Sequence, residues 1–404
     1  MKLENQYTKR DGQNYYEVLQ EFKDYKKPLI DTPTKEKKYK ISDLPWKKDR
    51  KRHSLHSLCS RICSFPPALV RYFILNYSEE GDVIFDPFCG KGTLPLEALL
   101  NNRIGWGNDL SPEAYILTKA KVSRVNPKRF FNYLDKINLR LDNIDSIQNI
   151  DPQVKIFFQN NTLKQILELR KLLNEKDDKY ATFTKAILLG ILHGSANNAL
   201  SLRCNHAYAM SPNYVKRYAK DHRLIRPKKN VLECIKNKAL TCFEDEIPKN
   251  IGKAYKSDSR KLRIKSNSCN LVVTSPPYFA VHTYARDNWL RLWFLGYNYK
   301  EISKLLLKTN SEEKYENFMY DSLQEMFRIL KDGSNCFIIV GDVKKHTVNG
   351  GIINTAEFLK KPAEHAGFIV KNILIDRIPP GKKALNSYLC TKGISTERIL
   401  HLVK

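Results

Sequence analysis

The sequence predicts an α/β protein of the doubly wound type, with a helical segment inserted into it. Two short apolar runs, 83–85 and 270–274, indicate buried strands, and each is followed at once by a motif rich in glycine or proline. Between them, residues 128–250 show apolar residues at helical spacing, as in Leu163, Ile166 and Leu167. This stretch is longer than a normal crossover connection, so we expect an inserted domain.

The C-terminal part of the chain is expected to supply the remaining elements of the sheet. Its pattern predicts a helix at 323–330 and a turn at 331–333. Strands are predicted at 336–340, 368–375 and 397–403, and the last of these would close the sheet.

The excess of basic residues indicates which kind of molecule the protein could bind. The 404 residues include 69 Lys and Arg against 43 Asp and Glu, a formal net charge of +26. A basic surface would supply the salt-dependent part of nucleic-acid binding, although a lysine-rich proteome would give the same excess. The nine cysteines form no Cys-x-x-Cys pair, which indicates reduced thiols and a cytoplasmic location. No apolar run is long enough for a membrane span.

A glycine motif follows the first strand and precedes an amphipathic helix. Gly90 and Gly92 allow unusual dihedral angles and let a ligand approach the backbone, and the free N–H groups of the helix would face that ligand. Asp109 ends the next expected strand, where a carboxylate would accept hydrogen bonds from ribose hydroxyls. A Walker loop is excluded by the residue order. Because Pro95 stands where the dinucleotide fingerprint needs Gly or Ala, a nucleoside without a pyrophosphate fits better.

A second motif, Ser275-Pro276-Pro277-Tyr278, follows the 270–274 strand. Its two prolines fix the backbone and remove two N–H donors, which leaves carbonyl acceptors beside an aromatic face. At this point the chain resembles the S-adenosylmethionine-dependent methyltransferases that modify exocyclic amino groups of bases. The segment 88–92 resembles their Phe-x-Gly-x-Gly cofactor motif, and 275–278 resembles their catalytic motif. The serine version is most typical of DNA cytosine-N4 methyltransferases.

The resemblance covers roughly residues 53–125 and 250–404, and it implies a Rossmann-like class I methyltransferase with a mostly parallel seven-stranded sheet. It also implies S-adenosyl-L-methionine as the cofactor and no metal. His53, His56, Cys59 and Cys63 could form a metal cluster, but a structural zinc site usually has a second, separated ligand pair. The residues expected to bind the cofactor are Ser64, Phe65, Asp86, Pro87, Phe88, Gly90, Gly92, Thr93, Asp109, Leu110, Asp258 and Ser259.

Catalytic roles follow from the same resemblance. The Ser275 side chain and the Pro276 carbonyl are expected to accept hydrogen bonds from the target amino group, within a backbone that Pro277 helps to hold rigid. Tyr278 is expected to stack on the base. Asp258 is expected to bind the amino group of the cofactor's adenine.

Four parts of the chain are predicted: a basic N-terminal arm at 1–52, catalytic segments at 53–127 and 251–404, and a target-recognition domain at 128–250. Trp46 is the part of the arm expected to dock. Basic residues interleaved with aromatic ones suit contacts to phosphates and base edges, although a solvated helix with a tyrosine-lined core side is the alternative. The residues expected to contact nucleic acid are Arg203, Tyr214, Lys216, Arg217, Lys228, Lys229, Tyr284 and Arg286.

The predicted function is site-specific methylation of the N4 amino group of cytosine in double-stranded DNA, with a cognate restriction endonuclease as a candidate partner. Adenine-N6 methylation stays open, since serine before Pro-Pro is only a preference. RNA or tRNA base methyltransferases usually carry Asp or Asn there. A glutamine methyltransferase of proteins would carry Asn-Pro-Pro-Tyr, and the intact motifs argue against a catalytically dead binding module. The recognition sequence and the choice between monomer and dimer also stay open.

Overall fold

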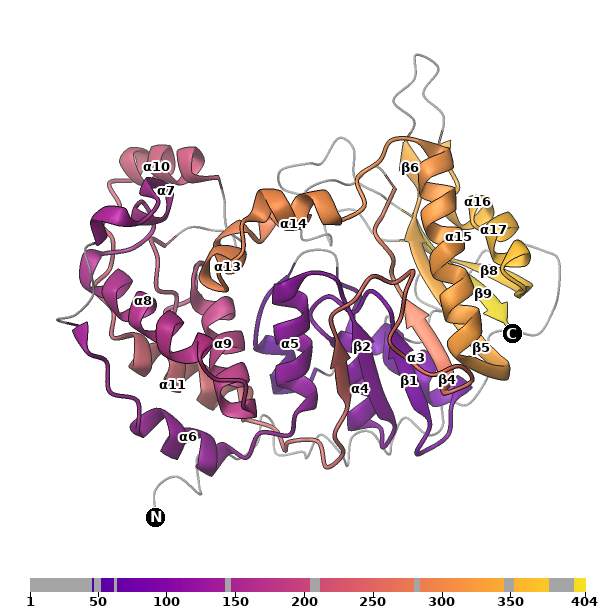
Figure 1. The fold of residues 1–404 in the computed structure, drawn as a ribbon, viewed down its shortest axis with the longest axis horizontal. Helices are drawn as coiled ribbons and strands as arrows, with labels where there is room; N and C mark the ends of the chain where they lie inside the picture. The colour runs from indigo at the N-terminus through magenta and orange to yellow at the C-terminus, as the bar shows by residue number, and fades with distance from the viewer. Residues whose placement is uncertain are drawn as a thin grey trace.

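The structure is a computed structural model that describes residue 46 and residues 52–61, 64–141, 147–203, 211–279, 284–344, 352–377 and 396–404. Its centre is a seven-stranded sheet in the order β3-β2-β1-β4-β5-β9-β8 (Figure 1). Strand β9 runs antiparallel to β5 and β8, and the other pairings are parallel. The mostly parallel seven-stranded sheet is therefore confirmed. The strands are β1 Val83–Asp86, β2 Ile104–Asn108, β3 Lys253–Tyr255, β4 Cys269–Thr274, β5 Leu330–Gly341, β8 Ile369–Arg377 and β9 Thr396–Val403.

Helices cover both faces of the sheet because successive strand residues point to opposite sides. In β4, Leu271 and Val273 pack with α3 (Pro67–Tyr77) and α4 (Thr93–Leu100), whereas Val272 packs with α15 (Glu312–Ile329). A parallel strand buried on both faces is a continuous apolar run, which is why β1 and β4 can be recognised in the sequence.

The predicted turn at 331–333 was wrong. These residues lie inside β5, which begins at Leu330 directly after α15. Gly333 takes a φ of +74°, and its N–H donates to the carbonyl of Lys404 at 3.0 Å. The residues that suggested a turn therefore include one glycine, Gly333, that has a left-handed backbone conformation inside a strand. Smaller elements follow: β6 Val343–Lys344, β7 Ile352–Ile353, α16 Thr355–Phe358 and α17 Lys360–His365.

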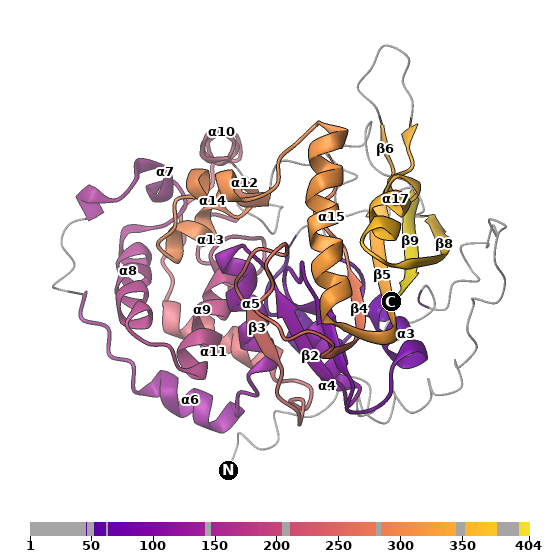
Figure 2. The same cartoon turned by 45° about the vertical axis from the view of Figure 1, so that its right-hand side comes forward.

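The segment 128–250 is helical, as predicted, within the residues described. Its helices lie beside the β2–β3 side of the sheet, against α5 (Pro112–Val122) (Figures 1 and 2). Helix α6 begins just before the segment. The elements are α6 Pro127–Asp135, η6 Ile147–Asn149, α7 Pro152–Lys155, α8 Asn160–Asn174, α9 Lys179–Ile191, α10 Pro212–Asp221 and α11 Val231–Cys242.

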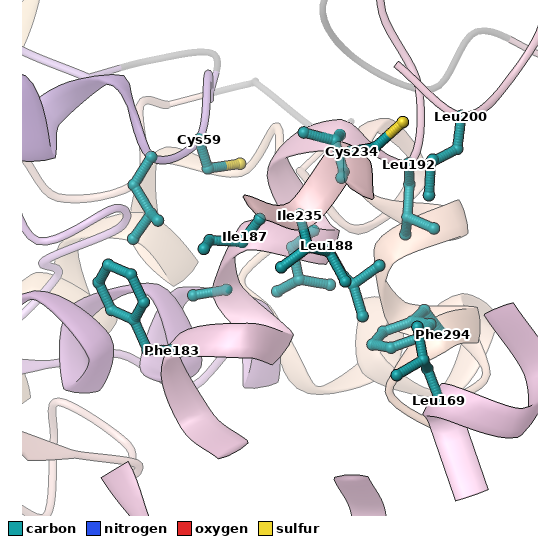
Figure 3. Close-up of a cluster of buried hydrophobic side chains, with 14 of the residues drawn as sticks. Cys59, Leu169, Phe183, Ile187, Leu188, Leu192, Leu200, Cys234, Ile235 and Phe294 are labelled. Atoms are coloured by element: carbon teal, nitrogen blue, oxygen red, sulfur yellow. The ribbon is translucent and has the colours of Figure 1, made fainter. Parts of the chain in front are cut away.

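The helical segment shares one hydrophobic cluster with the rest of the protein. Figure 3 shows Phe183, Ile187 and Leu188 of α9 together with Cys59 from the segment before the sheet and Phe294 from beyond β4. The contact is close, since a Cβ added at Gly190 would lie 2.1 Å from the carbonyl oxygen of Leu58. The segment is therefore packed firmly against the part of the protein that contains the sheet.

Three short helices lie between β4 and α15 in the chain. They are α12 Tyr284–Asp287, α13 Trp289–Phe294 and α14 Tyr299–Leu305, and they lie at the end of the molecule toward which β4 points (Figures 1 and 2). Helix α10 lies at the same end.

The N-terminal arm is described only at Trp46 and from Arg52 onward. Trp46 docks as predicted: its side chain is 4% exposed, and its Nε1 donates to Asp376 Oδ2 at 3.0 Å. It also packs beside Tyr72 of α3, with ring centroids 5.1 Å apart. The short helix η4 (Ser54–Ser57) follows the arm. No helix in the described ranges is long and apolar enough to cross a membrane.

Candidate active site

A pocket opens at the carboxyl ends of four parallel strands. It holds about 800 Å³ of empty space and is open to solvent, and its walls come from the residues that follow β1, β2, β3 and β4. Strand β1 is flanked by β2 on one side and β4 on the other, so the pocket lies where the order of strands reverses. Open α/β sheets bind ligands in this position.

The pocket brings both sequence motifs together, although they are separated by more than 180 positions in the chain. Eleven residues named from the sequence line it: Pro87, Phe88, Asp109, Leu110, Asp258, Ser259, Ser275, Pro276, Pro277, Tyr278 and Tyr284. The parallel pairing of β1 with β4 places their ends side by side, which explains this convergence.

Asp109 holds the glycine turn in place. Its carboxylate accepts the N–H groups of Gly90 and Ser111, each at 2.9 Å. Gly90 and Gly92 have φ angles of +53° and +71°, in the left-handed region that favours glycine. Burial raises the pKa of Asp109, and Arg61 opposes that shift. Since each carboxylate oxygen has two lone pairs, the expected contact of Asp109 with ribose hydroxyls stays a prediction.

Asp86 lies behind the pocket and joins two strand ends. It is fully buried, and its Oδ1 accepts Phe88 N at 3.0 Å and Thr274 Oγ1 at 2.6 Å. Its Oδ2 has no hydrogen-bond partner among the described residues, and burial raises the pKa of Asp86 to about 7. Asp86 therefore fixes β1 against β4 below the cofactor motif.

Other expected cofactor residues do not line the pocket. Gly90, Gly92 and Thr93 form the turn and the start of α4 beneath it, and Thr93 is 2% exposed. Ser64 is exposed and its Oγ donates to the Arg61 carbonyl, at 3.4 Å. Phe65 packs against the cluster formed by α3. The roles proposed for these residues would have to be indirect or to involve their backbone.

The second motif is held at Pro277 and Tyr278. The Tyr315 hydroxyl donates to the Pro277 carbonyl at 3.1 Å, and Tyr278 N donates to the Tyr284 hydroxyl at 3.2 Å. The Tyr278 hydroxyl donates to Glu397 Oε1 at 3.3 Å. In contrast, the Ser275 hydroxyl has no hydrogen-bond partner in the part of the chain that the structure describes. Two residues of the motif are thus held in place, while its serine lines the pocket with no partner among the residues that the structure describes.

Asp258 and Ser259 are also engaged by neighbours. Arg260 binds the Asp258 carboxylate through Nη2 at 2.7 Å and lowers the pKa of Asp258 against the effect of burial. Ser259 Oγ lies 3.0 Å from Ser322 Oγ. The adenine contact expected of Asp258 would use its remaining acceptor capacity.

Sequence reasoning missed several residues that line the pocket: Arg61, Ser111, Ser257, Leu305, Leu306, Leu307 and Phe318. Three consecutive leucines at 305–307 in a polar stretch give a signal that could have been used. No sequence signal indicates Arg61, because it comes from a segment that precedes the sheet. Its guanidinium pairs with Glu113 at 3.3 Å.

The residues expected to contact nucleic acid occupy different surroundings. Lys216, Arg217, Lys228 and Arg286 are exposed, and Arg203 is exposed with its Nε donating to the Ser195 carbonyl. Two are more enclosed. Tyr214 stacks on Tyr218 against the helical cluster, and Lys229 Nζ donates to the Asn197 carbonyl at 2.9 Å. Tyr284 borders the pocket, whereas the others lie outside it.

The histidines weighed as metal ligands have separate partners. His53 Nε2 bonds to the Glu246 carbonyl at 2.9 Å, and His56 Nε2 bonds to Glu97 at 2.7 Å. Glu97 also binds Arg71 Nε at 2.9 Å; although burial opposes it, Arg71 and His56 lower the pKa of Glu97 to about 2. This buried cluster supports α4 behind the glycine turn. Cys63 lies outside the described residues.

Comparison with known families decides the class of protein. The model of the N6/N4 methyltransferase family, described as DNA methylase, matches residues 1–120 and 269–404. The chain belongs to this family. It is therefore a member of the DNA methyltransferases of the N4/N6 class, whose cofactor is S-adenosyl-L-methionine. The match omits 121–268, which includes the whole helical segment.

Curated relatives within this class match over parts of their length. The Type II methyltransferase M.MjaII of Methanocaldococcus jannaschii is 24% identical over 186 residues, which cover 43% of this chain and 35% of the relative. M.MvaI of Kocuria varians is 23% identical over 237 residues, covering 52% and 50%. The orphan methyltransferase M.BamHII of Bacillus amyloliquefaciens is 49% identical over 49 residues, covering 12% and 18%. The chain thus spans half or less of the relatives it matches.

Solved structures give distant likenesses. An S-adenosylmethionine-dependent methyltransferase from Methanosarcina mazei is 11% identical, with a TM-score of 0.33 over 82% of this chain and 96% of that one. TrmN from Thermus thermophilus is 11% identical, with a TM-score of 0.35 over 87% and 52%. The fold of this methyltransferase is established by its own strand order.

The pocket suits the cofactor of the family. Asp109 offers a carboxylate beside a glycine turn, while Phe88, Leu110 and Phe318 give an apolar wall. A nucleoside with an amino-acid tail needs this combination of acceptor, close backbone and apolar surface.

Proposed function

We propose that this protein methylates the exocyclic N4 amino group of cytosine at a specific site in double-stranded DNA. The observation that carries the proposal is the position of Ser275, which lines the same pocket as Phe88 and Asp109 and whose hydroxyl has no hydrogen-bond partner among the described residues. A hydroxyl and a carbonyl at this place suit an amino group with two hydrogens. The basic composition suits a polyanionic substrate.

The chemistry required of the protein is mainly positioning. The exocyclic nitrogen is a poor nucleophile because its lone pair is delocalised into the ring. Acceptance of its two hydrogens by Ser275 Oγ and the Pro276 carbonyl would draw it toward tetrahedral geometry and direct the lone pair. S-adenosylmethionine, when bound, supplies the activated methyl group. Holding nucleophile and methyl group in line accounts for much of the acceleration.

Tyr278 would stabilise the base outside the duplex. Flipping a base costs a few kcal/mol, and stacking on an aromatic side chain returns roughly 1–3 kcal/mol. Tyr278 is restrained at both ends: its backbone N–H donates to Tyr284, and its ring hydroxyl donates to Glu397. A restrained ring loses little freedom when the base arrives.

Adenine-N6 methylation of DNA is the second candidate, since the family model covers both N6 and N4 enzymes. The same two acceptors would serve the adenine amino group. The shape of the pocket would decide between cytosine and adenine, through the fit of the base against Tyr278 and the leucines at 305–307.

The test is to express the chain in a host that lacks DNA methylation and to map modified bases across the genome by single-molecule sequencing. N4-methylcytosine in one short motif would support the proposal and give the recognition sequence. N6-methyladenine would favour the second candidate. Unmodified DNA from cells that contain folded, cofactor-binding protein would contradict both and direct attention to RNA.

A cognate restriction endonuclease is a further expected partner, since relatives are named Type II methyltransferases. We place the enzyme in the cytoplasm, where its substrate DNA would lie. Residues 128–250 are proposed as the target-recognition part, because exposed Lys216 and Arg217 of α10 lie at the end of the molecule where β4 ends (Figure 2).

A further inference from the structure

A second pocket lies outside the catalytic one, between the helical segment and the helices that follow β4. It holds about 930 Å³ of empty space, open to solvent. Its walls come from α7, α8, α13 and the start of α14, which lie together in Figure 1. Its lining is Asp151, Gln153, Arg170, Trp289, Trp293, Gly296, Tyr297, Asn298, Tyr299 and Lys300.

Arg170 is the feature that calls for a ligand. Its side chain is partly buried on α8, and its guanidinium lies 5.3 Å from the ring centroid of Trp293. No described residue forms an ion pair or a hydrogen bond with it. Burial lowers the pKa of Arg170. A planar guanidinium held in this way presents its N–H groups for an anion, and phosphate is the anion that matches its geometry.

The surrounding side chains suit a phosphate attached to a sugar. Lys300 adds a second cation, while Trp293 and Tyr297 offer aromatic surface beside the guanidinium. Tyr297 is 38% exposed, and its hydroxyl accepts from Lys256 Nζ at 3.2 Å. Asp151 is the one negatively charged residue among the described residues that line this pocket. The pocket is therefore cationic, with a single repelling group.

Helix α14 links the two pockets. Tyr299 at its start lines the second pocket, and Leu305 at its end lines the catalytic one. Six helical steps of 1.5 Å separate these residues by about 9 Å. A DNA strand advances 3.4 Å per nucleotide along the helix axis, so these two residues are separated by the length of about three nucleotides, and one DNA strand could reach both pockets.

We propose that the second pocket binds the DNA backbone about three nucleotides from the target base, with a phosphate at Arg170 and its deoxyribose against Trp293 and Tyr297. The proposal rests on the proposed function, since it assumes that the target base enters the catalytic pocket. It adds a positioning contact that fixes the strand relative to Ser275.

Three single variants test this contact in opposite directions. Arg170→Gln removes the charge and should weaken binding to a duplex that carries the methylated motif by about tenfold, with a salt slope smaller by about 1. Asp151→Asn removes the repelling charge while keeping a side chain that can cap α7, so it should tighten binding. Arg129→Gln is the matched control: it removes the same charge from an exposed position on α6, at the other end of the helical segment (Figure 1).

Fluorescence anisotropy with a labelled duplex, at several salt concentrations, measures all three variants, and thermal unfolding checks that each is folded. Replacing the phosphates one at a time by uncharged methylphosphonate locates the contact. One substitution near the third flanking nucleotide should weaken DNA binding by the wild type and leave binding by Arg170→Gln unaffected.

If Arg170→Gln matches Arg129→Gln in affinity and salt slope, the second pocket does not hold DNA although the methylation function stands. If the wild type neither binds nor methylates DNA, the proposed function itself fails, and this proposal with it.

Discussion

At the scale of single residues, the Ser275-Pro276-Pro277-Tyr278 motif combines held groups with one that has no partner among the described residues. Pro277 and Tyr278 are held by Tyr315, Tyr284 and Glu397, whereas the Ser275 hydroxyl lacks a partner among the described residues. An acceptor that is left unpaired in the free enzyme is available to a substrate amino group without first breaking another bond. The hydrogen bonds that hold the motif are made by Pro277 and Tyr278, so Ser275 itself does not take part in holding it.

Ser275→Ala should separate catalysis from cofactor binding. Removal of one hydrogen-bonding group aimed at the reacting atom should lower kcat by about 10²-fold, by analogy with other preorganised sites. The Kd for S-adenosylmethionine should stay within about twofold of the wild-type value. Single-turnover methylation and calorimetric titration measure the two quantities. Equal losses in both would show that Ser275 belongs to the cofactor site instead.

Tyr315→Phe tests the support behind the motif. Tyr315 is 1% exposed, and its hydroxyl is the donor to the Pro277 carbonyl at 3.1 Å. Phenylalanine keeps the ring but frees that carbonyl, so the backbone next to Pro276 should lose part of its restraint. We expect a few-fold lower kcat with an unchanged Kd for the cofactor.

Tyr320→Phe is the matched control for this substitution. Tyr320 lies on the same helix, and its hydroxyl accepts from Gln324 Nε2 at 2.9 Å, away from the motif. Its kcat should equal that of the wild type. If both tyrosine variants lose the same activity, the effect belongs to α15 as a whole, and the role given to Tyr315 is wrong.

At the scale of elements, the glycine turn between β1 and α4 depends on conformations that other residues rarely adopt. Gly90 lies at φ +53°, and a Cβ there would stand 2.8 Å from Arg61 Nη1. The turn is also tied to the end of β2 through Asp109. A side chain at Gly90 would therefore disturb both the turn and the arginine beside the pocket.

Gly90→Val should weaken cofactor binding at least tenfold, because left-handed backbone costs an L-residue about 1–2 kcal/mol and the added atoms displace Arg61. Gly333→Val carries the same kind of strain, with φ +74°, but nothing lies within 4 Å of its Cβ position, which is at the start of β5. It should lower thermal stability without changing the Kd. Equal affinity in the two variants would show that strain alone, and not the pocket, explains the loss.

At the scale of the whole molecule, buried histidines make stability depend on pH. His401 on β9 is 5% exposed, and its Nε2 lies 2.7 Å from Asn335 Oδ1. Burial, with a smaller effect of Lys371, lowers the pKa of His401 from 6.5 to about 4. As pH falls below 6.5, the unfolded chain therefore binds this proton first. Stability from this group is complete above 6.5 and is lost between 6.5 and 4.

His401→Gln should flatten this loss. Glutamine retains a polar group toward Asn335 but does not titrate, so the free energy of unfolding should fall less steeply with acid, by about 1.4 kcal/mol per pH unit. Urea unfolding of both proteins at about pH 7.5 and about pH 5 gives the difference. An unchanged pH slope would mean that other groups, such as His53 and His56, take up the protons.

The sequence by itself determined the framework of this enzyme. The continuous apolar runs of β1 and β4 indicate strands buried on both faces, and residues of the motifs that follow them line one pocket. These signals are local, because strand burial, glycine conformation and proline rigidity act within a few residues. The same motifs carried the resemblance to the family whose model matches residues 1–120 and 269–404.

Only the tertiary structure decided what surrounds those motifs. Arg61, Leu305 and Phe318 reach the catalytic pocket from separate segments, and Arg170 meets Trp293 across two parts of the chain. The turn predicted at 331–333 became part of β5 because pairing with the chain end outweighs local turn propensity. Contacts between distant segments depend on how helices pack on the sheet, and no local pattern in the sequence encodes that packing.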